Sequence, residues 1–326
     1  MIDLKKFPHI PLGLYPTPLH ALNNAGSMLG GKKRLYIKRD DLCGVVLGGN
    51  KVRKLEFILA DALLEGADSI IAGGSAQSNH AAIIAACCNR LGLCPHLLLQ
   101  EQGVTEQKGN LLINRIQGAN IRFVPADSSA ELDAEMEMER ERLIRAGKKP
   151  YLIPLGASSP LGALGYVSGM RELFLQAREH GLTFQHIVCA TGSGGMHAGI
   201  ALGAHLYSPQ TKVTGISVME PPVSSETIFQ LIRKTALLLR TRISFPPENI
   251  HLKHYAGPGY ASASPLGTYA MERMARAEGI LLDPIYTAKA FGGLIDLNDQ
   301  GYFAPGSNVL FLHSGGLPTI FAVPVY

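Results

Sequence analysis

The chain has 326 residues, 46% of them hydrophobic, and a formal charge of +4. Single cores stop growing near ~250–300 residues, so this length is enough for two domains. The basic residues form no dense run beyond residues 32–34 and 51–54, which argues against a nucleic-acid partner. No uncharged apolar run approaches the ~20 residues of a membrane span, and the first residues lack the apolar core of a signal peptide, so no membrane partner is expected.

The cysteines are odd in number, and two of them lie inside an apolar run of helical character. They are Cys43, Cys87, Cys88, Cys94 and Cys189. This pattern favours reduced thiols in a reducing compartment, and we expect a cytoplasmic protein. No spacing of metal ligands appears, so no metal site is predicted.

Strands and helices alternate along the chain. Short apolar runs predict strands over residues 35–38, 69–74, 95–99, 121–124, 151–154, 187–190, 212–218 and 309–312. Between them the patterns predict helices over residues 51–65, 80–91, 109–117, 130–146, 162–179, 197–205, 226–240 and 266–278. The alternation predicts an α/β fold of open, mostly parallel sheets with helices on both faces.

The first motif in chain order is Lys51, which opens a predicted helix directly after Gly48-Gly49-Asn50. The two glycines permit unusual backbone angles, and Asn50 can cap the helix. Such a turn would hold the lysine amine in one place, and the positive end of the helix dipole would lower its pKa. A neutral amine is what a Schiff-base lysine needs, although the motif taken alone favours a solvated lysine at a helix start.

Four polar residues, Gln77 to His80, follow the predicted strand over 69–74 and enter the next helix. A helix cap by Ser78 or Asn79 accounts for one of them and not for four. The helix start could also receive a substrate carboxylate.

Three glycine-rich turns lie at predicted strand ends, over residues 73–75, 191–195 and 314–316. In parallel sheets, ligands collect at the carboxyl ends of the strands. The middle turn, TGSGGMHAG, lets backbone N–H groups approach an anion at a helix start, and it is neither a P-loop nor a dinucleotide fingerprint. It predicts a phosphate cradle, with a plain tight strand–helix turn as the alternative.

Two tyrosines stand beside proline or glycine in polar loops, namely Tyr260 in GPGY and Tyr286 in DPIYTAKA. A phenol there packs or transfers a proton, depending on where its hydroxyl points. Ser314, at the end of the last predicted strand, could meet a ligand or cap the turn.

Taken together, these motifs resemble a known family. GGNKVRKLE, QSNH, TGSGGMHAG, DPIYTAKA and HSGG occur in one order, from about Phe7 through the C-terminus. They resemble the fold-type II pyridoxal-phosphate enzymes of the D-cysteine desulfhydrase and 1-aminocyclopropane-1-carboxylate (ACC) deaminase family. The resemblance implies pyridoxal 5′-phosphate in a cleft between a larger domain (1–50 and 163–326) and a smaller one (51–162). It also implies a small amino-acid substrate and a homodimer.

The resemblance also implies roles for individual residues. Lys51 would form the Schiff base with the cofactor, and Asn79 would bind the phenolic oxygen of its ring. Ser78 would bind the substrate carboxylate or assist proton transfer, so the catalytic set is Lys51, Ser78, Tyr260 and Tyr286. The other cofactor-binding residues would be Asn50, Lys54, Thr191, Gly192, Ser193, Gly194, Gly195, Met196, Thr287 and Ser314. The substrate-binding residues would be Ser78, Asn79, His80, Tyr260 and Tyr286.

Two departures from the family pattern concern the site. Met196 stands where desulfhydrase relatives carry a threonine, so a side-chain hydroxyl is missing from the phosphate loop. Ala81-Ala82-Ile83 follow QSNH, where relatives typically carry an arginine or threonine and a glutamine. The first change affects the phosphate contact, and the second affects the substrate pocket.

The choice within the family depends mainly on Thr287. ACC deaminases carry a glutamate at this position, facing the pyridine nitrogen, where it strengthens the ring as an electron acceptor. A hydroxyl at Thr287 and another at Ser314 favour β-elimination, with D-cysteine giving pyruvate, sulfide and ammonia, and with Lys51 removing the α-proton. His80, in place of a deaminase-type glutamine, points the same way. The alternatives are ACC deaminase, giving 2-oxobutanoate and ammonia, or action on L-cysteine or D-serine.

Two readings lie outside this chemistry. A non-catalytic amino-acid or phosphate binder on the same scaffold would have no need of Lys51. A dinucleotide enzyme is disfavoured because the glycine spacing and an acidic ribose partner are not evident.

Overall fold

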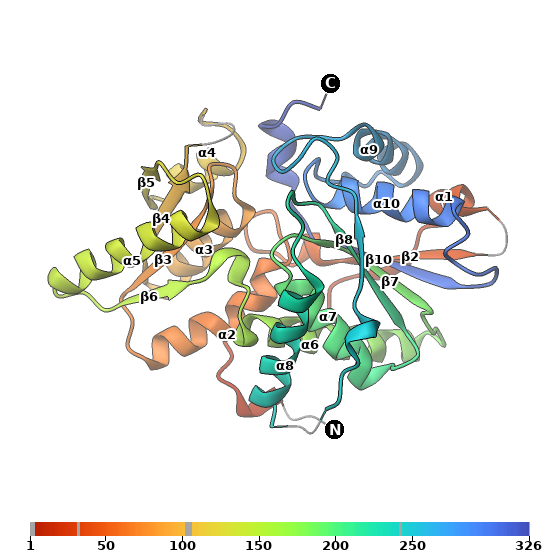
Figure 1. The fold of residues 1–326 in the computed structure, drawn as a ribbon, viewed down its shortest axis with the longest axis horizontal. Helices are drawn as coiled ribbons and strands as arrows, with labels where there is room; N and C mark the ends of the chain where they lie inside the picture. Colours follow the sequence, from red (N-terminus) through yellow and green to blue (C-terminus); the bar gives the residue numbers. More distant parts are fainter. Residues whose placement is uncertain (1–3, 31–32, 102–105, 241–242, 326) are drawn as a thin grey trace.

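The computed structural model describes residues 4–30, 33–101, 106–240 and 243–325, which form two sheets side by side (Figure 1). The larger sheet has the strand order β1-β2-β10-β7-β8-β9 and the smaller has the order β5-β4-β3-β6. The larger contains β1 (Leu19–Ala21), β2 (Arg34–Arg39), β7 (His186–Thr191), β8 (Lys212–Ser217), β9 (His251–His254) and β10 (Asn308–His313). The smaller contains β3 (Ser69–Ser75), β4 (Cys94–Gln100), β5 (Asn120–Val124) and β6 (Pro150–Ile153).

Every strand pair is parallel except β1 with β2. The carboxyl ends of the strands in each sheet therefore meet at one edge, as the sequence predicts. The predicted domain boundaries remain a prediction, but the strands of the larger sheet all come from residues 19–39 and 186–313, and those of the smaller from 69–153.

Helices connect the strands throughout. They are α1 (Asn23–Gly26), α2 (Lys51–Leu64), α3 (Asn79–Leu91), α4 (Gly109–Ile116), α5 (Ser129–Arg145), α6 (Pro160–Glu179), α7 (Gly195–Tyr207), α8 (Ser225–Leu238), α9 (Pro265–Glu278) and α10 (Thr287–Asp299). Short 3₁₀ helices are η1 (Leu4–Lys6), η2 (Ser27–Leu29), η3 (Asp40–Leu42), η4 (Leu155–Ala157), η5 (Pro247–Asn249) and η6 (Leu317–Phe321). All sixteen elements that the sequence predicts are present, with ends within two residues of the prediction.

Both faces of each sheet are covered, so the predicted fold class is confirmed. In the larger sheet one apolar core lies under α6, α7 and α8, and a second lies under α1, α9 and α10 (Figure 1). In the smaller sheet α2 and α3 cover one face and α5 the other. Burial of these apolar stripes is the main force that holds the helices on the sheets.

The sequence does not predict β1, β9, α1 or α10, and its interpretation of residues 283–289 as a polar loop is wrong from Thr287 onwards. Helix α10 starts there because the carboxylate of Asp283 accepts the backbone N–H groups of Ile285, Tyr286 and Thr287 at 3.0, 2.9 and 2.7 Å. Those N–H groups would otherwise be unpaired at the helix start.

A buried ionic cluster anchors the start of α2, the helix that Lys51 opens. Arg53 donates two hydrogen bonds to Asp40 and two to Glu172 of α6, all at 2.9 Å. Lys38 of β2 also donates to Glu172. A Cβ on Gly165 of α6 would lie 2.2 Å from the Arg53 carbonyl oxygen, so glycine is what allows the two helix backbones to meet. The cluster therefore fixes α2 against both β2 and α6.

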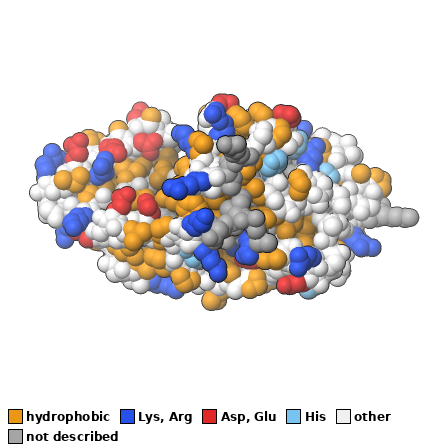
Figure 2. Space-filling model, turned by 90° about the horizontal axis from the view of Figure 1, so that it is seen from below, with side chains coloured by type: hydrophobic (Ala, Val, Ile, Leu, Met, Phe, Trp, Pro, Cys, Tyr) orange, Lys and Arg blue, Asp and Glu red, His pale blue; other side chains and the backbone are white. Residues whose placement is uncertain are grey.

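The surface carries both signs of charge. On the face in Figure 2, basic and acidic side chains are intermixed, with apolar side chains between them. Within the described ranges no helix is long and apolar enough to cross a membrane. The same residues contain no cluster of histidine, cysteine and carboxylate side chains that could hold a metal ion. All five cysteines are free thiols.

Candidate active site

The turn before Lys51 is pinned to the loop that follows β10. Gly49 forms an isolated antiparallel bridge with Gly315, and the N–H of Asn50 donates to the carbonyl of Ser314 at 3.0 Å. Gly48 has φ +74°, and a Cβ there would lie 1.7 Å from the Asp41 carbonyl oxygen. Only glycine fits such a position, so the turn holds Lys51 in one place.

The amine of Lys51 donates a hydrogen bond to the side-chain oxygen of Asn50 at 3.0 Å. Burial lowers the pKa of this amine to about 8, against the opposing effect of the Asp283 carboxylate. Desolvation, more than the helix dipole, is therefore the cause of the low pKa that the sequence predicts.

The expectation that Asn50 caps α2 is wrong. Asn50 already has helical angles, φ −59° and ψ −19°, and its side chain makes no capping bond. Its amide instead contacts the Lys51 amine and, at 3.2 Å, the sulfur of Met196. Asn50 thus joins the lysine to the glycine loop after β7.

That glycine loop leaves backbone donors open. Gly194 precedes α7 with φ +85°. Among the described residues, the N–H groups of Ser193, Gly194 and Met196 have no hydrogen-bond acceptor. Unpaired N–H groups at the start of a helix are suited to an anion, so the predicted cradle has the geometry to bind one.

Lys54 lies beside the cradle. Its amine donates to the carbonyl of Gly156 at 2.6 Å, and a Cβ on Gly195 would lie 2.8 Å from it. Burial, and then the charge of Lys51, hold the pKa of Lys54 well below its usual range. An anion in the cradle would restore the charged form, because an opposite charge raises a lysine pKa.

Ser78 and Asn79 lie at the start of α3, after β3. Ser78 caps the helix, since its hydroxyl oxygen accepts the N–H of Ala81 at 3.2 Å. The side-chain oxygen of Asn79 accepts a hydrogen bond from Asn110 at 2.6 Å, which leaves the N–H₂ group of Asn79 as a donor. Asn110, which orients Asn79 from α4, is not among the residues that the sequence predicts for the site.

His80 is buried, and its ring lies beside the backbone carbonyl of Pro154. Burial, and then the charges of Lys51 and Lys54, hold its pKa well below the usual range. His80 is therefore neutral and lies within the field of both amines.

The two predicted tyrosines meet. The hydroxyl of Tyr286 donates to that of Tyr260 at 3.0 Å, and Tyr260 lies 3.2 Å from the hydroxyl of Ser75 at the end of β3. Burial, then the neighbouring Tyr260, raise the pKa of Tyr286 well above its usual range, so this phenol stays protonated. The chain of three hydroxyls runs from the smaller sheet to the larger one. The sequence analysis marked the turn over 73–75 and gave Ser75 no role.

Thr287 and Ser314 flank the same edge of the larger sheet. The hydroxyl of Thr287 donates to the Asp283 carboxylate at 2.7 Å and accepts the Asp283 N–H at 2.8 Å. A Cβ on Gly316 would lie 2.7 Å from the carboxyl carbon of Asp283, so the Ser314–Gly316 turn lies against Asp283. The Asp283 carboxylate beside this edge is therefore occupied by hydrogen bonds from its own turn.

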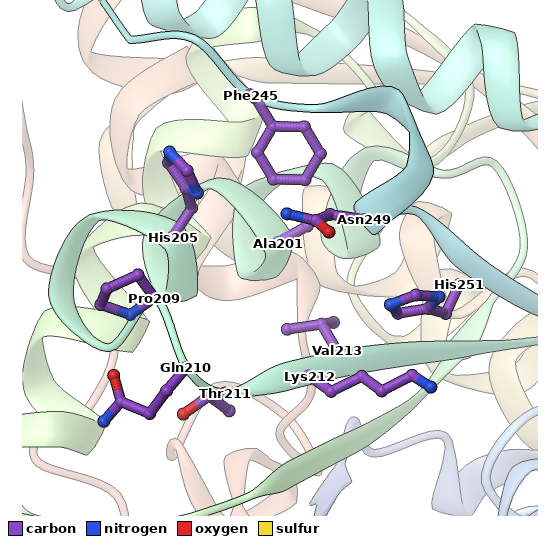
Figure 3. A pocket seen from close by; sticks show the side chains of 10 residues that line it. All are labelled: Ala201, His205, Pro209, Gln210, Thr211, Lys212, Val213, Phe245, Asn249 and His251. Atoms are coloured by element: carbon purple, nitrogen blue, oxygen red, sulfur yellow. The ribbon is translucent and has the colours of Figure 1, made fainter.

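A hollow also lies elsewhere, at the opposite end of β8 (Figure 3). His205 of α7 and Phe245 line it and contact each other edge to face, with ring centres 5.3 Å apart. It contains none of the predicted site residues. The candidate site is therefore the set of turns at the strand ends, which offers a weakly basic amine, an anion cradle and a hydroxyl chain.

Comparisons with known proteins match nearly the whole chain. A family described as "Pyridoxal-phosphate dependent enzyme" matches residues 10–315. A protein of Pyrococcus abyssi, provisionally named 1-aminocyclopropane-1-carboxylate deaminase, is 40% identical over 98% of this chain and 94% of its own. D-cysteine desulfhydrase of Salmonella typhi is 39% identical over 98% of this chain and 97% of its own. The crystal structure of an ACC deaminase homologue superposes with a TM-score of 0.90 at 38% identity, covering 98% of this chain and 94% of that one.

Proposed function

The chain belongs to the family of pyridoxal-phosphate dependent enzymes, and on that basis we propose that it converts D-cysteine and water to pyruvate, sulfide and ammonia. The predicted family resemblance and the predicted cofactor are both confirmed. The family relation supports a lyase that acts on a small amino acid, and the choice of D-cysteine is our proposal.

The residues present fit pyridoxal phosphate. Lys51 would hold it through its side-chain nitrogen, and the open N–H groups of residues 193, 194 and 196 would bind its phosphate. Lys54, a buried amine beside these donors, would then lie next to an opposite charge. The N–H₂ group of Asn79 would donate to the phenolic oxygen of the ring.

Lys51 supplies the base. When bound, pyridoxal phosphate takes up the electron pair left at the substrate α-carbon. The α-proton passes to the Lys51 nitrogen, which can accept it because a pKa of about 8 keeps part of the amine neutral near neutral pH. Asn50 orients this nitrogen through its side-chain oxygen.

The observation that carries the choice of substrate is the state of Asp283. Its carboxylate accepts three backbone N–H groups and the Thr287 hydroxyl, so it is not free to accept a hydrogen bond from a protonated ring nitrogen. Hydroxyls at Thr287 and Ser314 leave the ring a weaker electron acceptor. A weaker acceptor suffices for β-elimination, because departure of the thiol removes the negative charge at once, and it suits cyclopropane opening less well.

The hydroxyl chain would serve the leaving group. Ser75, Tyr260 and Tyr286 are joined at 3.2 and 3.0 Å. Because the pKa of Tyr286 is raised, this phenol stays protonated, so its hydroxyl remains a hydrogen-bond donor and does not compete with Lys51 as a base. Ser78 would bind the substrate carboxylate at the start of α3.

The second candidate function is ACC deamination. It is favoured by the name of the Pyrococcus abyssi relative and by the superposed ACC deaminase homologue. L-cysteine and D-serine are further candidate substrates, because the residues above act on the α-proton and β-substituent of any of these amino acids.

A side-by-side assay of the holoenzyme tests the proposal. D-cysteine, L-cysteine, D-serine and ACC are supplied in turn, and pyruvate, 2-oxobutanoate and sulfide are measured. We expect the highest kcat/KM with D-cysteine and equal amounts of pyruvate and sulfide. A higher kcat/KM for ACC, with release of 2-oxobutanoate, would refute the proposal. Lys51→Ala is the control and should abolish turnover of every substrate.

We also propose that the protein is a cytoplasmic homodimer. Four of its five free cysteines are buried, which is compatible with a reducing compartment. Sedimentation equilibrium of the holoenzyme tests the assembly, and a monomer at micromolar concentration would contradict it.

A further inference from the structure

We propose that Ser158 is a further cofactor-binding residue, which closes the phosphate cradle from the side of the smaller sheet. This inference rests on the proposed site of pyridoxal phosphate and holds whichever amino acid is the substrate. Ser158 is not predictable as a site residue from the sequence, because it follows a strand of the other sheet and adjoins a helix cap.

Both side-chain hydrogen bonds of Ser158 go to the glycine loop. Its hydroxyl oxygen is 2.7 Å from the hydroxyl oxygen of Ser193 and accepts the N–H of Gly195 at 3.2 Å. Ser193 and Gly195 are the residues that begin the cradle and α7. Ser158 therefore reaches the cradle from the end of η4, which follows strand β6 of the smaller sheet.

The backbone turn before Ser158 approaches the glycine loop closely. Gly156 and Ala157 both have left-handed angles, with φ +61° and +54°. Such an angle is costly for alanine, so the surrounding structure must enforce it. The Gly156 carbonyl receives the Lys54 amine at 2.6 Å, and a Cβ on Gly156 would lie 2.4 Å from the Ser193 hydroxyl. This one turn thus brings both a hydroxyl and an amine to the loop.

The hydroxyl of Ser158 has a proton to spare for an anion. Its oxygen accepts the Gly195 N–H, while its proton can point to Ser193 or to a phosphate oxygen. With phosphate in the cradle, the Ser158 and Ser193 hydroxyls can both turn their protons to the anion, because the oxygen of each can still accept. Hydrogen bonds to a charged acceptor are stronger than those between two neutral hydroxyls, which favours this exchange.

A merely structural clasp is the competing explanation. If Ser158 only joins η4 to the glycine loop, its removal should weaken the binding of pyridoxal phosphate and of pyridoxal alike. A phosphate contact makes a different demand, since only ligands that carry phosphate should be affected. Pyridoxal, which lacks the phosphate, distinguishes the two.

The test is a titration of the cofactor-free full chain with pyridoxal phosphate and, separately, with pyridoxal. Absorbance of the bound ligand gives the dissociation constant for the wild type, Ser158→Ala and Ser158→Cys. We expect both variants to bind pyridoxal phosphate roughly tenfold more weakly or worse, since a hydrogen bond to a charged group is lost. Pyridoxal should bind them as it binds the wild type. Ser158→Cys keeps nearly the same volume, so it provides the comparison if the alanine variant folds poorly.

Ser159→Ala is the matched control, because the Ser159 hydroxyl accepts the N–H of Gly162 in α6 and leaves the cradle intact. It should leave both dissociation constants unchanged. The inference is overturned if Ser158→Ala binds pyridoxal phosphate within twofold of the wild type, or if both ligands weaken equally. Failure to release pyruvate from D-cysteine, with the Ser158 effect present, would instead refute only the proposed substrate.

Discussion

Replacing Lys51 by methionine should stabilise the cofactor-free protein at neutral pH. The folded chain holds the pKa of this amine at about 8, against 10.5 ordinarily, mainly through burial. At ~1.36 kcal/mol per pKa unit, the charged amine costs the fold about 3.4 kcal/mol. The lost hydrogen bond to Asn50 takes away roughly 1 kcal/mol, and the Lys51 side chain keeps some contact with solvent, so a net gain of about 1–2 kcal/mol is expected.

The gain should depend on pH in a defined way. Below pH 8 the amine is protonated in both the folded and the unfolded chain, so the cost to the wild type is complete. Between pH 8 and 10.5 the unfolded amine keeps its proton and the folded one releases it, so the wild type gains stability relative to the variant. Above pH 10.5 the electrostatic advantage of methionine should be gone.

Urea unfolding of the two cofactor-free proteins at pH 7, 9 and 10.5 measures this difference. Lys148→Met, which alters an exposed lysine, is the control and should change stability by less than about 0.5 kcal/mol. The reasoning fails if Lys51→Met is no more stable than the wild type at pH 7, or if its advantage does not shrink as pH rises.

Three further substitutions test other parts of the structure. Gly195→Ala places a Cβ 2.6 Å from the Ser158 hydroxyl oxygen, so the affinity for pyridoxal phosphate should fall at least about tenfold in an absorbance titration. An unchanged affinity would show that the cradle has room for the added methyl group. Tyr286→Phe removes the hydroxyl that donates to Tyr260, so steady-state kinetics should show kcat reduced by about 10²-fold with little change in KM. An unaltered kcat would exclude the hydroxyl chain from proton transfer. Arg53→Met leaves Asp40 and Glu172 buried without their guanidinium, so urea unfolding should show a loss of about 3–5 kcal/mol, and a loss under 1 kcal/mol would contradict the assigned network.

Long apolar segments are predictable from the sequence because their periodicity reports directly on burial. Helix α3 and strands β3 and β7 are examples, with ends within one residue of the prediction. Strand β9 was not predicted because it is a four-residue edge strand, HLKH, in which the alternation of apolar and polar residues is too short to indicate a strand. α10 was missed because its initiation depends on one carboxylate, Asp283, and the DPIYT sequence otherwise reads as a turn.

Site residues that belong to no sequence motif, and whose partners lie on distant segments, were harder to predict. The motifs predicted that Lys51, the glycine loop and Tyr286 belong to one site, and the structure connects them through Asn50 and Asp283. The contacts of Asn110 and Ser158 were not predictable, because each is a lone polar residue whose partner lies on a distant segment. The same holds for the buried cluster around Arg53, since charged residues are ordinarily expected at the surface.

The position of β10 has a consequence for how the protein is made. β10 lies between β2 and β7, so strand β2, complete at residue 39, finds its parallel neighbour only when residues 308–313 have left the ribosome. Until then Leu35 and Ile37, which end fully buried, have one side of their strand unpaired, and the turn before Lys51 lacks the bridge from Gly315. Such long-range pairing makes folding slow and exposes the growing chain to aggregation. Lys51 is thus among the first residues synthesised and among the last to acquire its surroundings.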